Sequence, residues 1–366
     1  MRIAQVAPVV ERVPPKLYGG TERVVSYLTE ELIRQGHEVT LFASGDSITL
    51  GRLVPICEEA LRLSPRGYDV MPYNVLLIER VLQQAESFDI IHFHTDYMHF
   101  PVFRRHRTPS LTTLHGRLDL PDLMPLYREF SDMPLVSISN AQRLPIPWAN
   151  WERTIYHGLP QDLLQPQNER GKYLAFLGRI CPEKRPDRAI RIARDLGMDL
   201  KIAAKVDNAD KDYHEQVIKP LLSDARVEFV GEISDSDKSA FLSQAYATVF
   251  PIDWPEPFGL TIIESMACGT PVVAYCAGSV PEIVDNGVTG FVVGNHRQAL
   301  KAVERAGELD RSAIRRQFEE RFSVERMTAE YLDLYATLSD NVHMDVVPPA
   351  RQETVRLDIA AGEMPR

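Results

Sequence analysis

Apolar residues recur along the chain first in short continuous runs and then at helical spacing, and this order repeats. Residues 2–7 form an apolar run that a proline ends, which is typical of a buried parallel strand. Residues 21–35 carry an apolar stripe at helical spacing, and residues 37–44 form the next strand-like run. This strand–helix–strand order predicts a βαβ unit, and such units build parallel sheets.

The same order continues through two blocks, which we interpret as an N-terminal domain (1–165) and a C-terminal domain (166–338). A polar, proline-bearing stretch at 160–172 is typical of the linker between them. In the first block we predict further strands at 89–94, 110–114 and 135–138 and a helix at 74–87. In the second block we predict strands at 173–177, 200–204, 227–230, 247–250, 271–274 and 290–293 and helices at 186–196, 213–222, 236–244, 259–268, 297–306 and 323–338. Residues 339–366 lack a clear period and are predicted to be a tail, with disorder favoured for its last ten residues.

Composition fits two soluble domains and excludes several classes. The 366 residues are 44% hydrophobic and 25% charged, which is enough apolar material for two cores. The formal net charge of −10 argues against a nucleic-acid partner, which needs a basic surface. Scattered cysteines without a CxxC pair, no 18-residue apolar run and no signal-peptide pattern predict a cytoplasmic protein without a disulfide framework, a zinc site or a membrane-spanning helix.

The densest chemistry lies in residues 253–269, DWPEPFGLTIIESMACG. Two prolines make its first part a loop, and a helix is expected to start near Gly259. Free backbone N–H groups at that start, on Phe258, Gly259 and Leu260, favour an anion such as a phosphate. Glu256 and Glu264 could reach one ligand from different ends. The alternative is a capping loop followed by an amphipathic helix with a solvated glutamate.

Residues 256–264 resemble the E-x7-E element of the retaining nucleotide-sugar glycosyltransferases of the GT-B fold (glycosyltransferase family 4, glycosyl transferases group 1). The following runs, 266–274 and 278–291, also resemble that family, and the resemblance covers nearly all of residues 1–338, more weakly in the N-terminal half. It implies an α/β fold with two Rossmann-like domains facing a central cleft and a C-terminal helix that crosses back to the N-terminal domain. It also implies that Glu264 binds the donor ribose, and that Glu256 and the backbone from Phe258 to Leu260 hold the donor hexose and phosphate.

A second segment, residues 176–186, places Arg179 and Lys184 just after a predicted strand, where α/β sheets bind ligands. Two cations there suit a diphosphate, and the alternative is a solvated basic turn. The resemblance implies that both bind the donor diphosphate and offset the charge of the leaving group, so that no metal is required. Arg185 is predicted to be a surface residue.

The N-terminal block contributes a Gly-Gly turn and histidines. A ligand can approach the backbone closely at Gly20, although the dinucleotide fingerprint GxGxxG is absent. The resemblance implies that Gly20 faces the cleft and that His115 lies near the reacting sugar. His94 and Asp96 are further candidates, for the acceptor site. A metal site built on His92, His94 and Asp96 is the alternative, and buried, hydrogen-bonded histidines are favoured over it.

Three further features bear on specificity. Asp210 and Asp212, like Asp235 and Asp237, match a DxD spacing, but their loop and helix-start contexts predict structural roles, with Asp235 as an N-cap. Loops 205–207 and 231–232 are the candidates for binding the nucleobase. The first loop departs from the Gly-rich turn that the family commonly has there, which leaves the base open. Residues 156–160 depart from the family's usual hinge sequence.

The resulting prediction is a glycosyltransferase that moves a hexose from a nucleoside diphosphate sugar to an acceptor hydroxyl, with retention of configuration and without a metal or other cofactor. The C-terminal domain would bind the donor and the N-terminal domain the acceptor, which is a sugar, a lipid-linked molecule or a small metabolite. A peripheral contact with the inner face of a membrane through residues 103–107 stays open, although a solvated basic turn is favoured. The alternatives are a UDP-sugar 2-epimerase of the same fold, a dehydrogenase, which the missing GxGxxG disfavours, and a non-catalytic sugar-nucleotide-binding protein.

Overall fold

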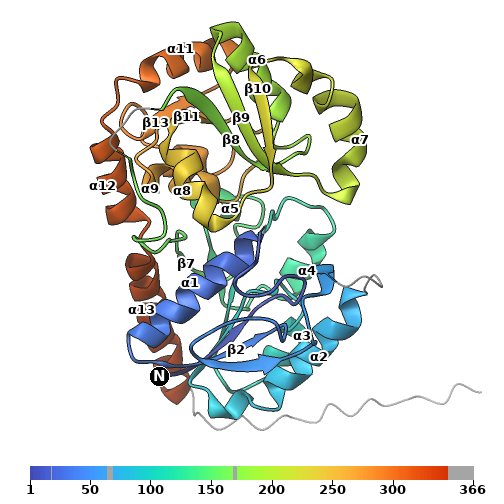
Figure 1. Cartoon of the computed structure of the whole chain (residues 1–366). Helices are drawn as coiled ribbons and strands as arrows, with labels where there is room; N and C mark the ends of the chain where they lie inside the picture. The colour runs from blue at the N-terminus through green and yellow to red at the C-terminus, as the bar shows by residue number, and fades with distance from the viewer. Residues whose placement is uncertain (18, 64–68, 168–170, 345–366) are drawn as a thin grey trace, which may run out of the picture.

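The computed structural model describes residues 1–17, 19–63, 69–167 and 171–344, which form two α/β lobes, one above the other in Figure 1. The N-terminal lobe contains a seven-stranded parallel sheet in the order β3-β2-β1-β4-β5-β6-β7. Its strands are β1 (Arg2–Val6), β2 (Glu38–Ala43), β3 (Arg52–Pro55), β4 (Ile90–Phe93), β5 (Ser110–Thr113), β6 (Leu135–Ser137) and β7 (Trp151–Thr154).

The C-terminal lobe repeats this plan with a six-stranded parallel sheet in the order β10-β9-β8-β11-β12-β13. Its strands are β8 (Tyr173–Arg179), β9 (Asp199–Lys205), β10 (Val227–Gly231), β11 (Ala245–Phe250), β12 (Val272–Tyr275) and β13 (Gly290–Val293). In both sheets the strand order reverses between the first and the fourth strand, β1 and β4 or β8 and β11. Doubly wound sheets bind ligands at such switch points, beyond the carboxyl ends of the strands.

Helices cover both sheets and follow most of the predicted ranges. The described α-helices are α1 (Gly20–Arg34), α2 (Val70–Leu82), α3 (Phe100–Phe103), α4 (Leu123–Glu129), α5 (Asn140–Arg143), α6 (Pro186–Leu196), α7 (Lys211–Tyr213), α8 (Asp235–Ser243), α9 (Leu260–Ala267), α10 (Val280–Ile283), α11 (His296–Ala306), α12 (Arg311–Arg321) and α13 (Val324–Met344). The helix predicted at 213–222 is wrong as one element. It is split into α7, a π-turn (His214–Ile218) and a 3-10 turn (Leu221–Ser223), because Pro220 cannot donate a backbone hydrogen bond within a helix.

The last described helix, α13, packs against the N-terminal lobe beside α1 (Figure 1). Its Met327, Tyr331 and Tyr335 share a buried cluster with Ile3 and Leu28. The helix continues to Met344, so the tail predicted from residue 339 starts too early, and residues 345–366 lie outside the described residues.

The chain passes between the lobes twice at one place. The Leu159 N–H donates to the Phe322 carbonyl at 2.9 Å, and the Val324 N–H donates to the Leu159 carbonyl at 3.0 Å. The segment that leaves the N-terminal lobe and the segment that returns to it are therefore tied together.

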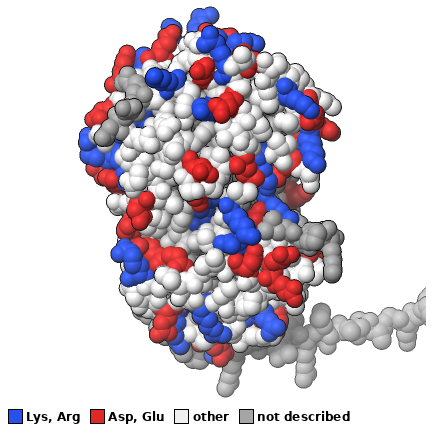
Figure 2. Space-filling model, viewed as in Figure 1, with Lys and Arg blue, Asp and Glu red and all other residues white. Residues whose placement is uncertain are grey.

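The surface mixes both signs of charge. In Figure 2 acidic and basic side chains are interspersed over both lobes on the visible face. Of the helices among the described residues, none combines the length and the apolar character needed to cross a membrane.

Candidate functional site

A cavity of about 450 Å³ opens between the two lobes, beyond the carboxyl ends of strands from both sheets. This volume lies in the usual range for small-molecule sites. Every residue that the sequence predicted to be catalytic or donor-binding lines this cavity: Gly20, His115, Arg179, Lys184, Glu256, Phe258, Gly259, Leu260 and Glu264. The two acceptor candidates, His94 and Asp96, do not line it.

Glu256 lies on the loop between β11 and α9 and is only 8% exposed. One of its carboxylate oxygens accepts a hydrogen bond from the Trp254 indole N–H at 2.9 Å and pairs with the Lys184 ammonium. The Lys184 Nζ also lies 5.0 Å from the centre of the Trp254 ring, within cation–π range. The two loops that carry Lys184 and Glu256 therefore meet in one partly buried ion pair.

Glycines at two positions shape the loop that carries Glu256. Gly259 has a φ of 90°, and a Cβ there would lie 3.0 Å from the Ile262 Cδ1. Gly278, on the segment before α10, has a φ of 55°, and its Cβ would lie 2.3 Å from the Glu256 carbonyl oxygen. The backbone around Gly278 thus packs directly against the loop that carries Glu256.

Glu264 points from α9 into a set of charges from both lobes. It is 4% exposed and accepts a hydrogen bond from the Lys238 ammonium at 2.6 Å, so the alternative of a solvated glutamate is wrong. Lys238 lies 3.2 Å from Asp235, which also pairs with Arg23 of α1. Asp235 is the first residue of α8, and Ser234 occupies the N-cap position, so the N-cap prediction is wrong as well.

Arg179 ends β8 at the edge of the cavity. Its guanidinium lies 3.6 Å from Asp207 and 3.4 Å from Asp210. Lys205 also pairs with Asp207, at 2.8 Å. The predicted nucleobase loop 205–207 and the first DxD segment are thus next to a predicted phosphate ligand.

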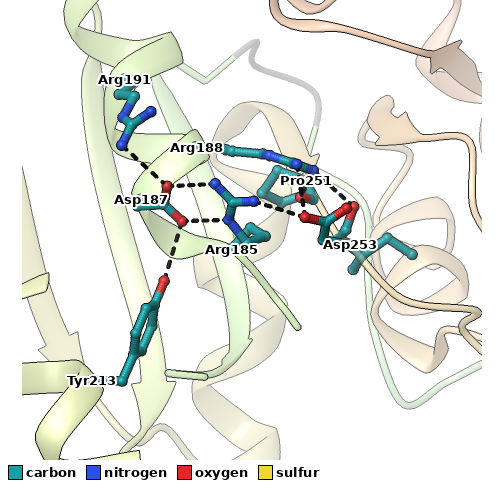
Figure 3. A network of polar contacts seen from close by, with 8 residues as sticks. Arg185, Asp187, Arg188, Arg191, Tyr213, Pro251 and Asp253 are labelled. Atoms are coloured by element: carbon teal, nitrogen blue, oxygen red, sulfur yellow. Dashed lines mark hydrogen bonds and ion pairs between the residues drawn. The ribbon is translucent and has the colours of Figure 1, made fainter. Parts of the chain in front are cut away.

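Arg185 lies outside the cavity with its side chain 25% exposed, which agrees with the predicted surface position, but its guanidinium is held in a network of ion pairs. It has a φ of 52°, and its guanidinium binds both carboxylate oxygens of Asp187, at 2.8 and 2.9 Å (Figure 3). The same group donates to Asp253 at 2.8 Å, and Arg188 donates to Asp253 at 2.9 Å. The hydrogen bond to Asp187 is the main cause that raises the pKa of Arg185. Arg185 joins the loop of Lys184 to the loop of Glu256.

Histidines form the N-terminal wall of the cavity. The half-buried His115 lies against His94, with 2.9 Å between its Nε2 and the Nδ1 of His94. On its other side the His157 ring stacks at a centroid distance of 5.2 Å. Burial lowers the pKa of His115 to about 3, so its ring is neutral. Within the described part of the chain no group of three or more His, Cys, Asp or Glu side chains is arranged to hold a metal ion.

Two carboxyl groups from the N-terminal lobe, which the sequence analysis did not single out, also line the cavity. Glu22, in the first turn of α1, is 7% exposed, and burial raises its pKa to about 7. Glu11 pairs with Arg62 at 2.9 Å, and burial raises its pKa as well. The only local signal for Glu22 is its place two residues after the Gly-Gly turn.

A second set of contacts closes the lobes on one another beside the cavity. The Glu282 carboxylate accepts the backbone N–H groups of Asn140 and Ala141, at 2.8 and 2.6 Å, and the Tyr156 hydroxyl at 3.0 Å. The Ser139 hydroxyl donates to the Pro257 carbonyl at 2.6 Å. These contacts join the start of α5 to the C-terminal lobe. They depend on the packing of the two lobes, so no local pattern could predict them.

Comparison with known proteins identifies relatives of both lobes. The family model "Glycosyl transferases group 1" matches residues 164–321, and the model "Glycosyltransferase Family 4" matches residues 18–158. D-inositol 3-phosphate glycosyltransferases of Mycobacterium tuberculosis and Mycobacterium bovis are 32% identical to the chain over 157 residues, which is 39% of this chain and 32% of the relative. The matched region thus spans about a third of these curated relatives.

Solved structures match nearly the whole chain. AviGT4, a glycosyltransferase involved in avilamycin A biosynthesis, is 23% identical, with a TM-score of 0.73 over 93% of this chain and 98% of that one. A sucrose-phosphate synthase from Thermosynechococcus elongatus is 19% identical, with a TM-score of 0.76 over 93% and 99%. Anabaena HepE, solved in complex with UDP and glucose, is 20% identical, with a TM-score of 0.73 over 92% and 100%. At these identities the likeness shows the fold.

Proposed function

The chain belongs to the glycosyltransferases of the GT-B fold, and from this premise we propose that it transfers a hexose from a nucleoside diphosphate sugar to an acceptor hydroxyl. One observation carries the proposal: a single cavity between the lobes gathers Arg179, Lys184, Glu256 and Glu264 at the carboxyl ends of the strands. A nucleotide-sugar donor also fits the fold, since the similarly folded HepE was solved with UDP and glucose.

The C-terminal lobe would bind the donor. Arg179 and Lys184 supply positive charge for the diphosphate, and the N–H groups at the start of α9 supply further donors. The donor would replace the carboxylate partners that these cations have in the free protein. Glu256, released from Lys184, can then accept hydroxyl groups of the hexose, and Glu264 those of the ribose. The positive charges of Arg179 and Lys184 would stabilise the negative charge that develops on the leaving diphosphate. For this reason we propose transfer without a metal.

The reaction would retain the anomeric configuration. The acceptor oxygen forms a bond to the anomeric carbon on the face where the bond to the diphosphate breaks. The electron pair of the broken bond leaves with the diphosphate, whose oxygen takes the proton of the acceptor hydroxyl. Double displacement needs one carboxylate as the nucleophile and a second group as the acid and base. Glu256 and Glu264, however, are bound to Lys184 and Lys238.

The acceptor would enter from the N-terminal lobe, whose side of the cavity holds Glu11, Glu22 and His115. Movement of the lobes about the paired segments at Leu159 and Phe322 would close the cavity and exclude water, which limits hydrolysis of the donor. His94 and Asp96 stay predictions for the acceptor site. A sugar, a lipid-linked molecule and a small metabolite remain the classes of acceptor to test.

A thermal-shift screen with UDP, GDP and ADP and their sugars tests donor binding, because a ligand that binds the folded state stabilises it, and a tighter ligand does so more. We expect one nucleotide series to raise the melting temperature of the wild type and not that of Lys184→Ala. Assays with that donor, with and without candidate acceptors, then test transfer. Interconversion of the sugar without an acceptor would indicate an epimerase, and binding without any turnover would indicate a non-catalytic binding protein.

A further inference from the structure

A line of hydrogen bonds runs from the cavity to the C-terminal helix through the buried interior. His115 contacts His94 at 2.9 Å, and the His94 Nε2 contacts the Gln5 side-chain oxygen at 2.8 Å. The Gln5 amide nitrogen donates to the Tyr335 hydroxyl of α13 at 3.2 Å. Gln5, His94 and Tyr335 are each at most 3% exposed, so solvent does not compete for these bonds.

The orientation of the Gln5 amide determines which nitrogen of each histidine carries the proton. The Gln5 oxygen can only accept, so the proton of His94 is on Nε2. Burial lowers the pKa of His94 well below its usual value, so the ring is neutral and its Nδ1 is an acceptor. The facing nitrogen of His115, Nε2, must then be the donor.

The second half of the line is compatible with this orientation of the Gln5 amide. Tyr335 accepts from Gln5, so its own hydroxyl donates to the His92 Nδ1 at 2.7 Å. The His92 Nε2 then donates to the Thr113 hydroxyl at 2.7 Å, and Thr113 donates to Tyr331 of α13 at 2.9 Å. Each of these groups is thus paired when the Gln5 amide has this orientation.

We propose that Gln5 and His94 are positioning residues that hold His115 in its Nε2–H form, so that the His115 Nδ1 is presented to the cavity as a hydrogen-bond acceptor for a hydroxyl group of the transferred hexose. None of the described residues donates a hydrogen bond to that nitrogen, although the His115 ring lines the cavity. The tautomer follows from the orientation of the Gln5 amide, and only the role toward the hexose rests on the proposed function. In the opposite form, Nδ1–H could not accept the hydroxyl proton.

The tautomers can be measured without any substrate. Long-range proton–nitrogen NMR correlations of the histidine rings in the ligand-free full chain distinguish protonated from unprotonated nitrogens, and His94→Gln and His115→Gln assign the signals. We expect Nε2–H and a bare Nδ1 for both His94 and His115. A bare Nε2 on His115, or a doubly protonated ring at neutral pH, would overturn the proposal.

Kinetics test what the tautomer does. Gln5→Glu keeps an oxygen that accepts from His94, whereas Gln5→Leu removes it and frees both tautomers. We expect Gln5→Leu to lower kcat/KM about tenfold, the usual scale for one lost hydrogen bond, and Gln5→Glu to restore most of it. Tyr331→Phe, at the far end of the line, is the matched control and should keep wild-type kinetics.

Equal activity of Gln5→Leu and Gln5→Glu in folded protein would refute the role. Absence of transfer by the wild type with every donor would instead refute the proposed function and leave the NMR result standing.

Discussion

Several charged side chains that line the cavity form ion pairs in the ligand-free protein, and the pair of Lys184 with Glu256 gives the clearest prediction. Its ammonium pairs with Glu256 at a side-chain exposure of 19%. Lys184→Ala should lower kcat/KM about 10²–10³-fold, since it removes a charge that acts on the leaving diphosphate and leaves Glu256 without its partner. Steady-state transfer assays measure this loss. Arg191→Ala is the control on the adjoining helix, because Arg191 is 53% exposed and pairs with Asp187 at 3.5 Å. Activity of Lys184→Ala within twofold of wild type would contradict the assigned role.

The buried carboxyl group of Glu22 should make the free energy of unfolding depend on pH. Burial raises its pKa in the folded protein from 4.5 to about 7, so the unfolded chain releases this proton first as the pH rises. The contribution of Glu22 to stability is therefore full below about pH 4.5 and is lost by about pH 7, a change of roughly 3 kcal/mol. Glu22→Gln, a neutral isostere, should remove that slope. Urea unfolding of both proteins at several pH values measures the difference, and parallel curves would show that the carboxyl is not desolvated.

At the scale of elements, two loops carry Lys184 and Glu256 of the proposed donor site, and Arg185 connects them through Asp253. The Asp253 side chain is 53% exposed, so its ion pairs with Arg185 and Arg188 contribute little to global stability. Asp253→Asn should therefore leave the melting temperature nearly unchanged and still lower kcat/KM about tenfold, because small displacements of Lys184 and Glu256 are costly for catalysis. Asp195→Asn, which loses an exposed contact with His296, should change neither quantity. A parallel loss of stability and activity in Asp253→Asn would assign the network a structural role only.

The loops also show what a sequence can and cannot predict. The place of Arg179, Lys184, Glu256 and Glu264 in one cavity was predictable because each lies in a local motif just after a parallel strand or in the helix that follows one, while their roles stay predictions. The edge strands β3 and β7 were missed, since both are short and only partly buried and thus lack a continuous apolar run. The helix α12 was also missed. Lys238 was missed because its partner Glu264 is on another element, 26 residues away.

At the scale of the whole molecule, the contact between the lobes at Glu282 should control how far the cavity opens. Its carboxylate accepts two backbone N–H groups from the start of α5 and the Tyr156 hydroxyl, and burial is the main cause that raises the pKa of Tyr156 to about 12. Bonds of this kind, to a charged acceptor, are about twice as strong as neutral ones. The same carboxylate thus holds both the helix start and the segment that leads out of the N-terminal lobe.

Glu282→Gln replaces one of the accepting oxygens by an NH₂ group that faces a backbone donor, so the closed arrangement loses at least one hydrogen bond while each lobe keeps its own core. The balance between closed and open molecules should shift about tenfold toward the open form. Small-angle scattering should then report a larger radius of gyration, and the KM for the donor should rise at an unchanged melting temperature. Tyr156→Phe, which removes a single bond to the same carboxylate, should give a smaller effect in the same direction. Glu308→Gln, an exposed change at the end of α11, should give none. Identical scattering for Glu282→Gln and wild type would mean that the paired segments at Leu159 and Phe322 fix the lobes without this contact.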